Sequence, residues 1–352
     1  MNKLVAVAQV ALCLVFVFCN NGGGQTKPSE LVGQWVDISE YEDYDDNEDS
    51  ELIKNIELFK DGTGVVDGRT ISWKVENKRF VILSSGSGMS CNYKVSGYEL
   101  ALAYDDGKSA IFVKKGKWEE YKAQKIADAK KMAEKAKESV TRFKDSRDGK
   151  VYKIVKVGSQ TWFAENLNYA AEGSKCFGEG GVVFDGYDDE GNPIPTKLSN
   201  AEVQANCVKY GRLYTWSTAK QACPAGTHLP TSEEWNTLVN YVGGKKTRTA
   251  GTKLKSSTDW KNDEDVPAGT DEYAFSALPG GHGSLDGWFY HNGTSGGWWS
   301  STELDAYFAS AWATGGSGES FNDVNMIYEA TRRDDGSIRM YPLLFSVRCV
   351  QD

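Results

Sequence analysis

Short runs of alternating apolar and polar residues extend from residue 30 to residue 115. Examples are IKNIELF, RTISWKV, CNYKV and YELALA. Alternation with a period of two is typical of antiparallel strands that bury one face. The sequences DG, NK, SG and DDG separate these runs and favour hairpin turns. This pattern predicts a small antiparallel β-barrel or curled sheet over residues 30–115.

A helical period begins at Gly116. Residues 116–144 contain no Pro and no further Gly, and they are rich in the strong helix formers Ala, Lys and Glu. Apolar residues recur at steps of mostly three and four, at Trp118, Tyr121, Ile126, Ala129, Met132, Ala133, Ala136, Val140 and Phe143. We predict a connecting helix over residues 116–144. A dimerisation coiled coil is the alternative, but the middle of the stripe is largely alanine, which favours the connector.

Strand and helix patterns are mixed in the remaining residues, 145–352. VYKIVKVG and QTWFAENL predict the two strands of a hairpin, and WSTAKQA predicts a short helix. Loop-rich stretches lie between such patterns, in keeping with a composition of 37 Gly and 8 Pro. We expect an α+β fold class, with a β-domain, a long connecting helix and an α+β domain.

The stretch CPAGTHLPTSEEW, residues 223–235, allows three interpretations. Cys223 and His228 could form a nucleophile with its base, or they could belong to a zinc site. The chain has only three histidines and no cysteine pair at metal-ligand spacing, which weakens the zinc hypothesis. Nothing in the neighbouring sequence orients His228 as a base, which weakens the nucleophile hypothesis. In the structural interpretation Pro224 ends one helix and T-S-E-E caps the next. We predict a structural corner with no metal and no catalytic residue.

Charge excludes some classes of function. The net charge of −9 argues against a nucleic-acid partner, which requires a basic face, and gives no reason for electrostatic binding to an anionic membrane. The run EYEDYDDNEDSE, residues 40–51, holds eight carboxylates in twelve residues. It lacks the glycine at the sixth position of an EF-hand loop, so we interpret it as a solvated loop in preference to a calcium site.

The N-terminus has an apolar run from Leu4 to Phe18, which is short for a membrane span and suits a signal-peptide core. Residues 1–19 resemble a bacterial lipoprotein signal, in which Cys19 becomes the lipidated first residue, and a polar linker follows over residues 20–29. Phe18 departs from the small residue usual before that cysteine, so simple secretion and an uncleaved anchor are alternatives. All three export the chain, and the resemblance implies an outer-membrane or cell-surface lipoprotein.

An exported chain reaches an oxidising compartment, where cysteines are expected to form disulfide bonds. Five cysteines follow the signal: Cys91, Cys176, Cys207, Cys223 and Cys349. Four of them lie in the C-terminal part and can form two bonds. Cys91 is left over, and we expect it to be buried and inert.

Long motifs follow one another in the C-terminal part: DSRDGKVYKIVKVGSQTWFAENLNY, YGRLYTWSTA, CPAGTHLPTSEEW, LKSSTDW, DEYAFSALPGGHG, WWSSTE and VRCV. They resemble the Fibrobacter succinogenes major paralogous domain, with Thr227 where that family usually has Trp. The family looks related to the C-type lectin-like fold, whose helix cysteine pairs with one in the last strand. The resemblance implies the disulfide Cys223–Cys349 and, for the remaining pair, Cys176–Cys207. LVGQW, DGTG and YKVSGYELAL in turn resemble the lipocalin-like domains of bacterial surface lipoproteins.

The aromatic, glycine-rich sequence GGHGSLDGWFYHNGTSGGWWSSTE is the candidate for ligand binding. We expect residues 288–292 to lie in a loop between glycines, where flat rings can stack on sugars and polar groups can bind hydroxyls. The candidate residues are Trp288, Tyr290, His291, Asn292 and Asp286. Trp298 and Trp299 are interpreted instead as core residues of a strand.

The resemblance to C-type lectins does not extend to their calcium-dependent sugar motifs, a Glu-Pro-Asn or Gln-Pro-Asp loop and a Trp-Asn-Asp strand, which this sequence lacks. Nothing in the sequence pairs two carboxylates at glycosidase spacing, and the cysteines are expected to form disulfides. We therefore expect no enzymatic activity, no cofactor and no metal. The predicted function is a non-catalytic binding or adhesion module for polysaccharide or a surface protein. The alternatives are a structural envelope component and, third, a hydrolase.

Overall fold

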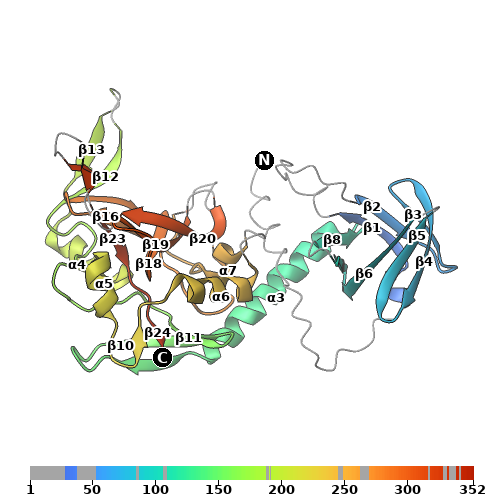
Figure 1. Cartoon of the computed structure of the whole chain (residues 1–352), viewed down its shortest axis with the longest axis horizontal. Helices are drawn as coiled ribbons and strands as arrows, with labels where there is room; N and C mark the ends of the chain where they lie inside the picture. Colours follow the sequence, from blue (N-terminus) through green and yellow to red (C-terminus); the bar gives the residue numbers. More distant parts are fainter. Residues whose placement is uncertain are drawn as a thin grey trace. The chain divides into compact units, whose positions relative to one another are not determined.

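The computed structural model describes the chain from Pro28 onward, with gaps. The described residues are 28–37, 53–84, 87–105, 109–187, 190, 192–244, 249–261, 269–315, 318–327, 331–332, 338–340 and 342–352. Contacts divide the chain into two units, Met1–Asp128 and Ala129–Asp352 (Figure 1). The predicted signal peptide with Cys19 and the acidic run at residues 40–51 lie outside the described residues.

The first unit contains a closed barrel of antiparallel strands. A short helix, α2 Pro28–Leu31, precedes β1 Gly33–Asp37, β2 Asn55–Leu58, β3 Thr63–Val66, β4 Arg69–Glu76, β5 Arg79–Ser84, β6 Ser87–Ser96, β7 Glu99–Ala103 and β8 Ser109–Lys114. Each strand pairs with the next, and β1 closes the barrel on β8 with Val36 opposite Val113. The prediction of a small antiparallel barrel is confirmed.

Two tight turns fix the register of the central barrel strands. Asp67 and Gly68 join β3 to β4, and Asn77 and Lys78 join β4 to β5. Their φ angles are 46°, 79°, 50° and 64°. Two successive left-handed residues are the geometry of a type I′ hairpin turn, which matches the twist of the flanking strands. The DG and NK pairs thus act as the sequence predicted.

Alternate side chains of the strands fill the barrel. In β4, Ile71 and Trp73 are buried between exposed polar neighbours, as expected for a strand with one buried face. The Trp73 indole nitrogen donates to the carbonyls of Phe59 and Thr63, so its polar atom is satisfied inside the barrel wall. Cys91 is fully buried in the same core, and burial raises the pKa of its thiol to about 11. The prediction that Cys91 is buried is confirmed.

Helix α3, Trp118–Glu138, follows the barrel. Trp118 and Tyr121 at its start pack against Val113 of β8. The Tyr121 hydroxyl donates to the buried carboxylate of Glu99 at 3.1 Å. These contacts fasten the first turns of α3 to the barrel wall.

The helix is shorter than the predicted span of residues 116–144. The backbone and side chain of Ser139 both donate to the carbonyl of Ala136, which ends the helix, and Thr141–Lys144 form strand β9. The apolar stripe is also less buried than expected, because Ile126 and Met132 are 45% and 41% exposed.

The second unit is built on two main sheets. A five-stranded sheet has the order β15-β24-β11-β10-β9, with β10 Val151–Val157, β11 Gln160–Phe163, β15 Thr227–His228 and β24 Val350–Gln351. The larger sheet has the order β13-β12-β17-β16-β23-β18-β19-β20, and β14 pairs with β23. Its strands are β12 Val182–Tyr187, β13 Pro193–Thr196, β14 Leu213–Tyr214, β16 Gly280–Ser284, β17 Trp288–Asn292, β18 Ser295–Glu303, β19 Phe308–Gly315, β20 Gly318–Ile327 and β23 Leu343–Ser346. The short pair β21 Thr331–Arg332 and β22 Ile338–Met340 completes the described strands. The predicted hairpin at the start of this unit is confirmed as β10–β11.

The helices of this unit are α4 Asn200–Tyr210, α5 Trp216–Ala222, α6 Ser232–Val242 and α7 Ala250–Leu254 (Figure 1). The predicted corner is confirmed: α5 ends at Cys223, and α6 begins with a capping box between Thr231 and Glu234. The apolar face of α6 packs against β18 and β19. No helix in the described part of the chain is both long enough and apolar enough to cross a membrane.

Strand β18 separates two parts of the core. Trp298 packs in a cluster with Trp235 and Trp312, whereas Trp299 faces Phe345 and Trp216 on the opposite side of the sheet. Successive residues of a strand point to opposite faces, so these two tryptophans serve both clusters. Both are fully buried, which confirms them as core residues of a strand.

A buried arginine links the second unit's segments. Arg348 is fully buried and donates to the carbonyls of Phe163, Phe275 and Ser276 and to the side-chain oxygen of Asn166. The same Asn166 oxygen accepts from the Trp298 indole at 2.8 Å. Burial lowers the pKa of Arg348 to about 9, so the guanidinium remains mostly charged at neutral pH. Polar groups, not only apolar packing, therefore hold the centre of this unit together.

Candidate functional site

The candidate segment forms a strand, and the expectation of a loop is wrong. Residues 288–292 are strand β17, which pairs antiparallel with β16 and parallel with β12. Phe289 is fully buried among Phe177 and Leu344, whereas Trp288 and Tyr290 are half-buried. The alternating pattern W-F-Y fits a strand that buries Phe289, and the flanking glycines only mark its ends.

Aromatic rings form a row across this sheet. Trp288 stacks on Tyr290 with ring centroids 6.2 Å apart, and Tyr290 stacks on His282 at 5.3 Å. His282 in turn stacks on Phe345 at 5.4 Å, and Phe184 of β12 lies 5.8 Å from Tyr290. Burial lowers the pKa of His282 to about 4, so this ring is neutral at neutral pH and behaves as a flat aromatic surface. The row continues from the half-buried Trp288 into the core.

Asp286 does not join the other candidates. It is exposed in the turn between β16 and β17, and its carboxylate accepts from the backbone nitrogen of Trp288 at 3.4 Å. This contact gives Asp286 a role in the hairpin turn. It is also absent from the residues that line the cavity described next.

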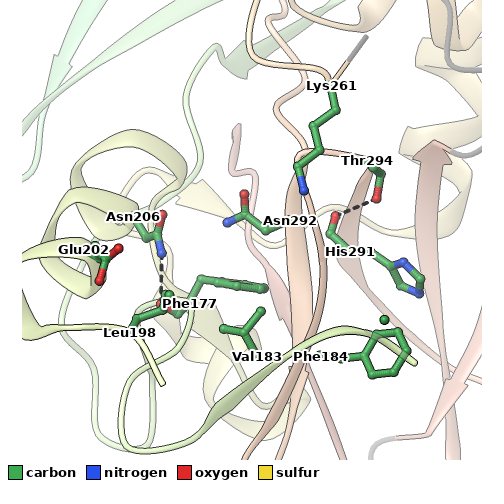
Figure 2. A pocket seen from close by; sticks show the side chains of 11 residues that line it. Phe177, Val183, Phe184, Leu198, Glu202, Asn206, Lys261, His291, Asn292 and Thr294 are labelled. Carbon is green, nitrogen blue, oxygen red and sulfur yellow. Dashed lines mark hydrogen bonds between the residues drawn. The ribbon is translucent and has the colours of Figure 1, made fainter. Parts of the chain in front are cut away.

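His291 and Asn292 border a cavity of about 440 Å³ (Figure 2). The cavity is lined by Phe177, Val183, Phe184, Gly186, Leu198, Glu202, Asn206, Lys261, His291, Asn292 and Thr294. Helix α4, strand β12, the end of β17 and the segment before Lys261 thus provide its walls. Trp288 and Tyr290 lie outside this lining, so the structure separates the candidates into a ring row and a cavity wall.

The polar groups of the cavity come from both sides. Figure 2 shows Glu202 and Asn206 of α4 facing Asn292 across the space, with Lys261 reaching toward Asn292. The hydrogen bonds that Glu202 accepts in the described part of the chain fall on Oε2, from the backbone and hydroxyl of Ser199. They lower the pKa of Glu202, which is therefore ionised at neutral pH and has Oε1 left to accept from a ligand.

The amides of the cavity differ in how firmly they are held. Asn206 donates to the carbonyl of Phe177 at 3.3 Å, which fixes its orientation and leaves its oxygen directed away from that bond. Asn292 makes no side-chain hydrogen bond to the described residues, although it is half-buried. An amide in that state is available to a ligand, because it offers both donors and acceptors.

A disulfide bond braces the same wall. Cys176 and Cys207 are bonded, and they directly adjoin the cavity residues Phe177 and Asn206. Arg212 donates to both sulfurs, and it also contacts Ser174 and Glu179. The second bond joins Cys223 to Cys349, so both pairs agree with those that the resemblance implied.

His291 has an unusual backbone. Its φ is 62°, in the left-handed region that non-glycine residues seldom adopt, and the facing Gly281 has a φ of 64°. The Thr294 hydroxyl donates to the His291 carbonyl at 3.2 Å and holds this bend (Figure 2). Such strain is concentrated at binding and catalytic sites, where it aims a side chain that a regular strand would place elsewhere.

Cys223 has no free thiol to act as a nucleophile, because it is bonded to Cys349. His228 bonds instead to two carboxylates, with 2.7 Å to Asp352 and 2.9 Å to Glu234. Burial alone would lower the pKa of His228, but these two hydrogen bonds outweigh it and raise the pKa above the usual value. His228 therefore joins three chain segments. No group of three or more His, Cys, Asp or Glu side chains in the described ranges could hold a metal ion.

Several cavity residues were missed by the sequence analysis, namely Phe177, Phe184, Glu202, Asn206 and Lys261. Glu202 and Asn206 are four residues apart on α4 and therefore share one helix face, which is a weak signal without the facing strand. Lys261 and Phe184 stand in loop-rich sequence and give no signal of their own.

The sequence model of the Fibrobacter succinogenes major domain matches residues 155–351, which is more than half of the chain. The chain belongs to this family. The matched range of the Fibrobacter succinogenes major domain includes the ring row, the whole cavity lining, both disulfide bonds and Arg348. Searches among curated proteins and among solved structures returned no significant match.

Proposed function

We propose that the Fibrobacter succinogenes major domain of this chain is a non-catalytic module that binds a neutral carbohydrate in the 440 Å³ cavity. One observation carries the proposal: the cavity joins the unpartnered amide of Asn292 to Glu202 and Asn206 of α4, beside the ring of Phe184. The partner is a polysaccharide; a glycan chain on a surface protein would present the same chemistry.

The chemistry of sugars supports this choice. Sugar rings have apolar faces that pack on aromatic rings, and their hydroxyls both donate and accept hydrogen bonds. Amide and carboxylate groups match those hydroxyls, and the cavity volume falls in the range typical of small-ligand sites, roughly 300–1,000 Å³. The described lining has one carboxylate, Glu202, and glycoside hydrolysis requires two, which supports binding without catalysis.

The same proposal includes a specific fold assignment for each of the two units. We interpret the second unit as C-type lectin-like, supported by the helix α5 that ends in Cys223, the bond from Cys223 to Cys349 near the last strand, and the capped helix α6 that follows. The closed eight-stranded barrel supports a lipocalin-like assignment for the first unit.

The N-terminal sequence supports export and attachment to the cell envelope. An apolar run followed by Cys19 suits a lipoprotein signal, and a lipid on Cys19 would hold the binding module at a membrane surface. In that setting a carbohydrate-binding module acts as an adhesin or as a surface receptor for polysaccharide.

Affinity electrophoresis of the mature chain in gels containing neutral polysaccharides tests this function. We expect one of the polysaccharides to retard the wild type, and Asn292→Ala to weaken the retardation about tenfold, because a buried hydroxyl of the ligand would lose its partner. Asp286→Asn is the matched control, since Asp286 lies in the neighbouring turn outside the cavity. Trp288→Ala reports whether the ring row also contacts the ligand.

If the Asn292→Ala variant is retarded as strongly as the wild type, the cavity is not the binding site. If no polysaccharide retards the wild type, the carbohydrate hypothesis fails, and a stable protein partner found by cross-linking on whole cells would then favour the structural envelope role.

A further inference from the structure

A second cavity, of about 550 Å³, lies at the other end of helix α4. Its lining includes two deeply buried polar side chains, Asn166 at 4% and Asp271 at 7% exposure, and two exposed apolar residues, Val151 and Val208. Hydroxyl groups of the segment 256–258 complete the wall. The cavity thus combines a buried polar floor with an apolar rim, and no role proposed so far uses it.

Among the described residues that line this second cavity, positive and negative charges are equal in number. Its lining has three lysines, Lys150, Lys153 and Lys209, and three carboxylates, Glu165, Asp259 and Asp271. Lys209 pairs with Asp259 at 2.8 Å, and Lys153 pairs with Glu165 at 3.4 Å. The described lining of the first cavity likewise contains one cation, Lys261, and one carboxylate, Glu202. A lining without net charge gives no preference for an ionic ligand and suits a neutral one with many hydroxyls.

The floor of the second cavity is held rigidly. The two carboxylate oxygens of Asp271 accept from the backbone nitrogen and the hydroxyl of Ser276, each at 2.7 Å. Asp259, Asp271 and Ser276 all have left-handed backbones, with φ of 78°, 48° and 51°. Three non-glycine residues in that region around one cavity indicate that the surrounding structure imposes its shape.

The same two chain segments contribute walls to both cavities. On α4, Asn206 lines the first cavity and Lys209 the second, and three residues of helix span about 4.5 Å. On the facing segment, Asp259 lines the second cavity and Lys261 the first, and two residues of chain span at most about 7 Å. The helix and this segment are bonded to each other through Lys209 and Asp259. The two cavities therefore lie next to each other along α4 and this segment.

We propose that the two cavities are successive subsites for one extended neutral oligosaccharide, which follows α4 from Glu202 to Lys209. This inference rests on the proposed carbohydrate function and adds that the ligand is the interior of a polymer chain, not a single terminal sugar. The Lys209–Asp259 pair provides donors and acceptors for the distal sugar units, as Asn292 does for the proximal ones.

Titration calorimetry of the mature chain with cello-, xylo- and manno-oligosaccharides of increasing length tests the inference. For the series that binds, we expect affinity to rise about tenfold or more between the disaccharide and the hexasaccharide, because a second subsite adds contacts without a second association cost. The double variant Lys209→Met, Asp259→Asn removes the pair without leaving an unpaired charge, and asparagine tolerates the left-handed backbone at position 259.

The double variant should bind the disaccharide as the wild type does and should lose the gain with length, whereas Asn292→Ala should weaken every oligomer. Lys74→Met, Glu76→Gln, which removes an ion pair of the same 2.8 Å length on the barrel, is the matched control. If affinity does not rise with oligosaccharide length, or rises equally in the double variant, the extended site is refuted. Binding of the disaccharide would then still support the first cavity as a carbohydrate site. If no oligomer binds, the carbohydrate function itself fails and the extended site fails with it.

Discussion

The barrel and the Fibrobacter succinogenes major domain differ in the sequence separation of the contacts that hold them together. In the barrel every strand pairs with its neighbour in sequence, and only the closure of β1 on β8 is distant. In the second unit β24 lies between β15 and β11, and Arg348 reaches the carbonyl of Phe163 from 185 residues along the chain. Local turns specify the first architecture, whereas a few long-range bonds specify the second.

This difference predicts where single substitutions do most damage. Barrel strands are joined by turns that form locally, so the loss of one side chain leaves the remaining hairpins in place. The second unit depends on a covalent bond and a polar centre that bring distant segments together. Substitutions at those two places should therefore weaken the whole second unit and leave the barrel unchanged.

The largest effect is expected when Cys223 and Cys349 are both replaced by alanine. The bond closes a separation of 126 residues, and the chain-entropy account assigns such a loop about 5 kcal/mol of the free energy of unfolding. Hydrogen exchange read by mass spectrometry should show the loss in the second unit alone. Cys91→Ala is the control, because it removes a buried sulfur of the barrel and should cost only about 1–2 kcal/mol there.

Equal losses in both units after removal of the Cys223–Cys349 bond would contradict the contrast between the two architectures. The bond Cys176–Cys207 spans 31 residues and gives a second measure, with an expected contribution of about 4 kcal/mol.

Arg348→Met should have the next largest effect. The substitution leaves three backbone carbonyls and the Asn166 oxygen without this donor in a buried place, at a cost of about 3–5 kcal/mol. Hydrogen exchange read by mass spectrometry over a series of denaturant concentrations measures this loss of unfolding free energy. Arg79→Met in the barrel is the matched control: Arg79 pairs with the exposed Asp105 at 2.8 Å, and its loss should cost about 1 kcal/mol or less. Similar costs for the two arginines would show that the centre is held by packing alone.

The smallest effects are expected when histidines are replaced and stability is measured as a function of pH. All three histidines lie in the second unit, so only that unit should respond. The pKa of His282 is lowered to about 4, so its contribution to stability is present above pH 6.5 and is lost as the pH falls toward 4. Between pH 7.5 and pH 5, His282→Phe should reduce the acid-induced loss of stability by about 1–2 kcal/mol.

The contribution of His228 to stability changes with pH in the opposite direction to that of His282. Its raised pKa means that its contribution is fully present below pH 6.5 and is lost as the pH rises through the folded-state value. His228→Gln should therefore make the second unit more sensitive to acid, and barrel stability should not change with either variant. An acid response of His282→Phe equal to the wild type would show that folding does not lower the pKa of His282.

Local sequence signals predicted the barrel well. The DG and NK sequences form the hairpin turns that were expected, and the alternating run RTISWKV forms a strand that buries Trp73. The corner after Cys223 was predictable for the same reason, because Pro224 and the capping box around Glu234 act within a few residues. The helix prediction was wrong at its end, where Ser139 bonds back to Ala136 and a strand begins, and the predicted apolar stripe is only partly buried.

The candidate site was predictable only in part. His291 and Asn292 do border a cavity, but the opposite wall comes from α4, about ninety residues earlier in the chain, and no local pattern connects the two. The segment around Phe289 was mistaken for a loop because glycines flank it. Its place in the sheet depends on pairing with β16 and β12, which sequence alone does not reveal. Arg348 gave no signal either, since its partners are backbone carbonyls and the side chain of Asn166, all distant in the sequence.

The bond between Cys223 and Cys349 has one more consequence, for the response of the chain to proteolysis. Residues 224–348, which this bond encloses, contain most of the larger sheet and only one side of each cavity, including Asn292 of the first and Asp259 of the second. A protease that cuts once within that range divides the polypeptide but releases neither fragment. The cut domain stays covalently joined until a reductant breaks the disulfide bond. A nick in a loop therefore interrupts the backbone without releasing a fragment.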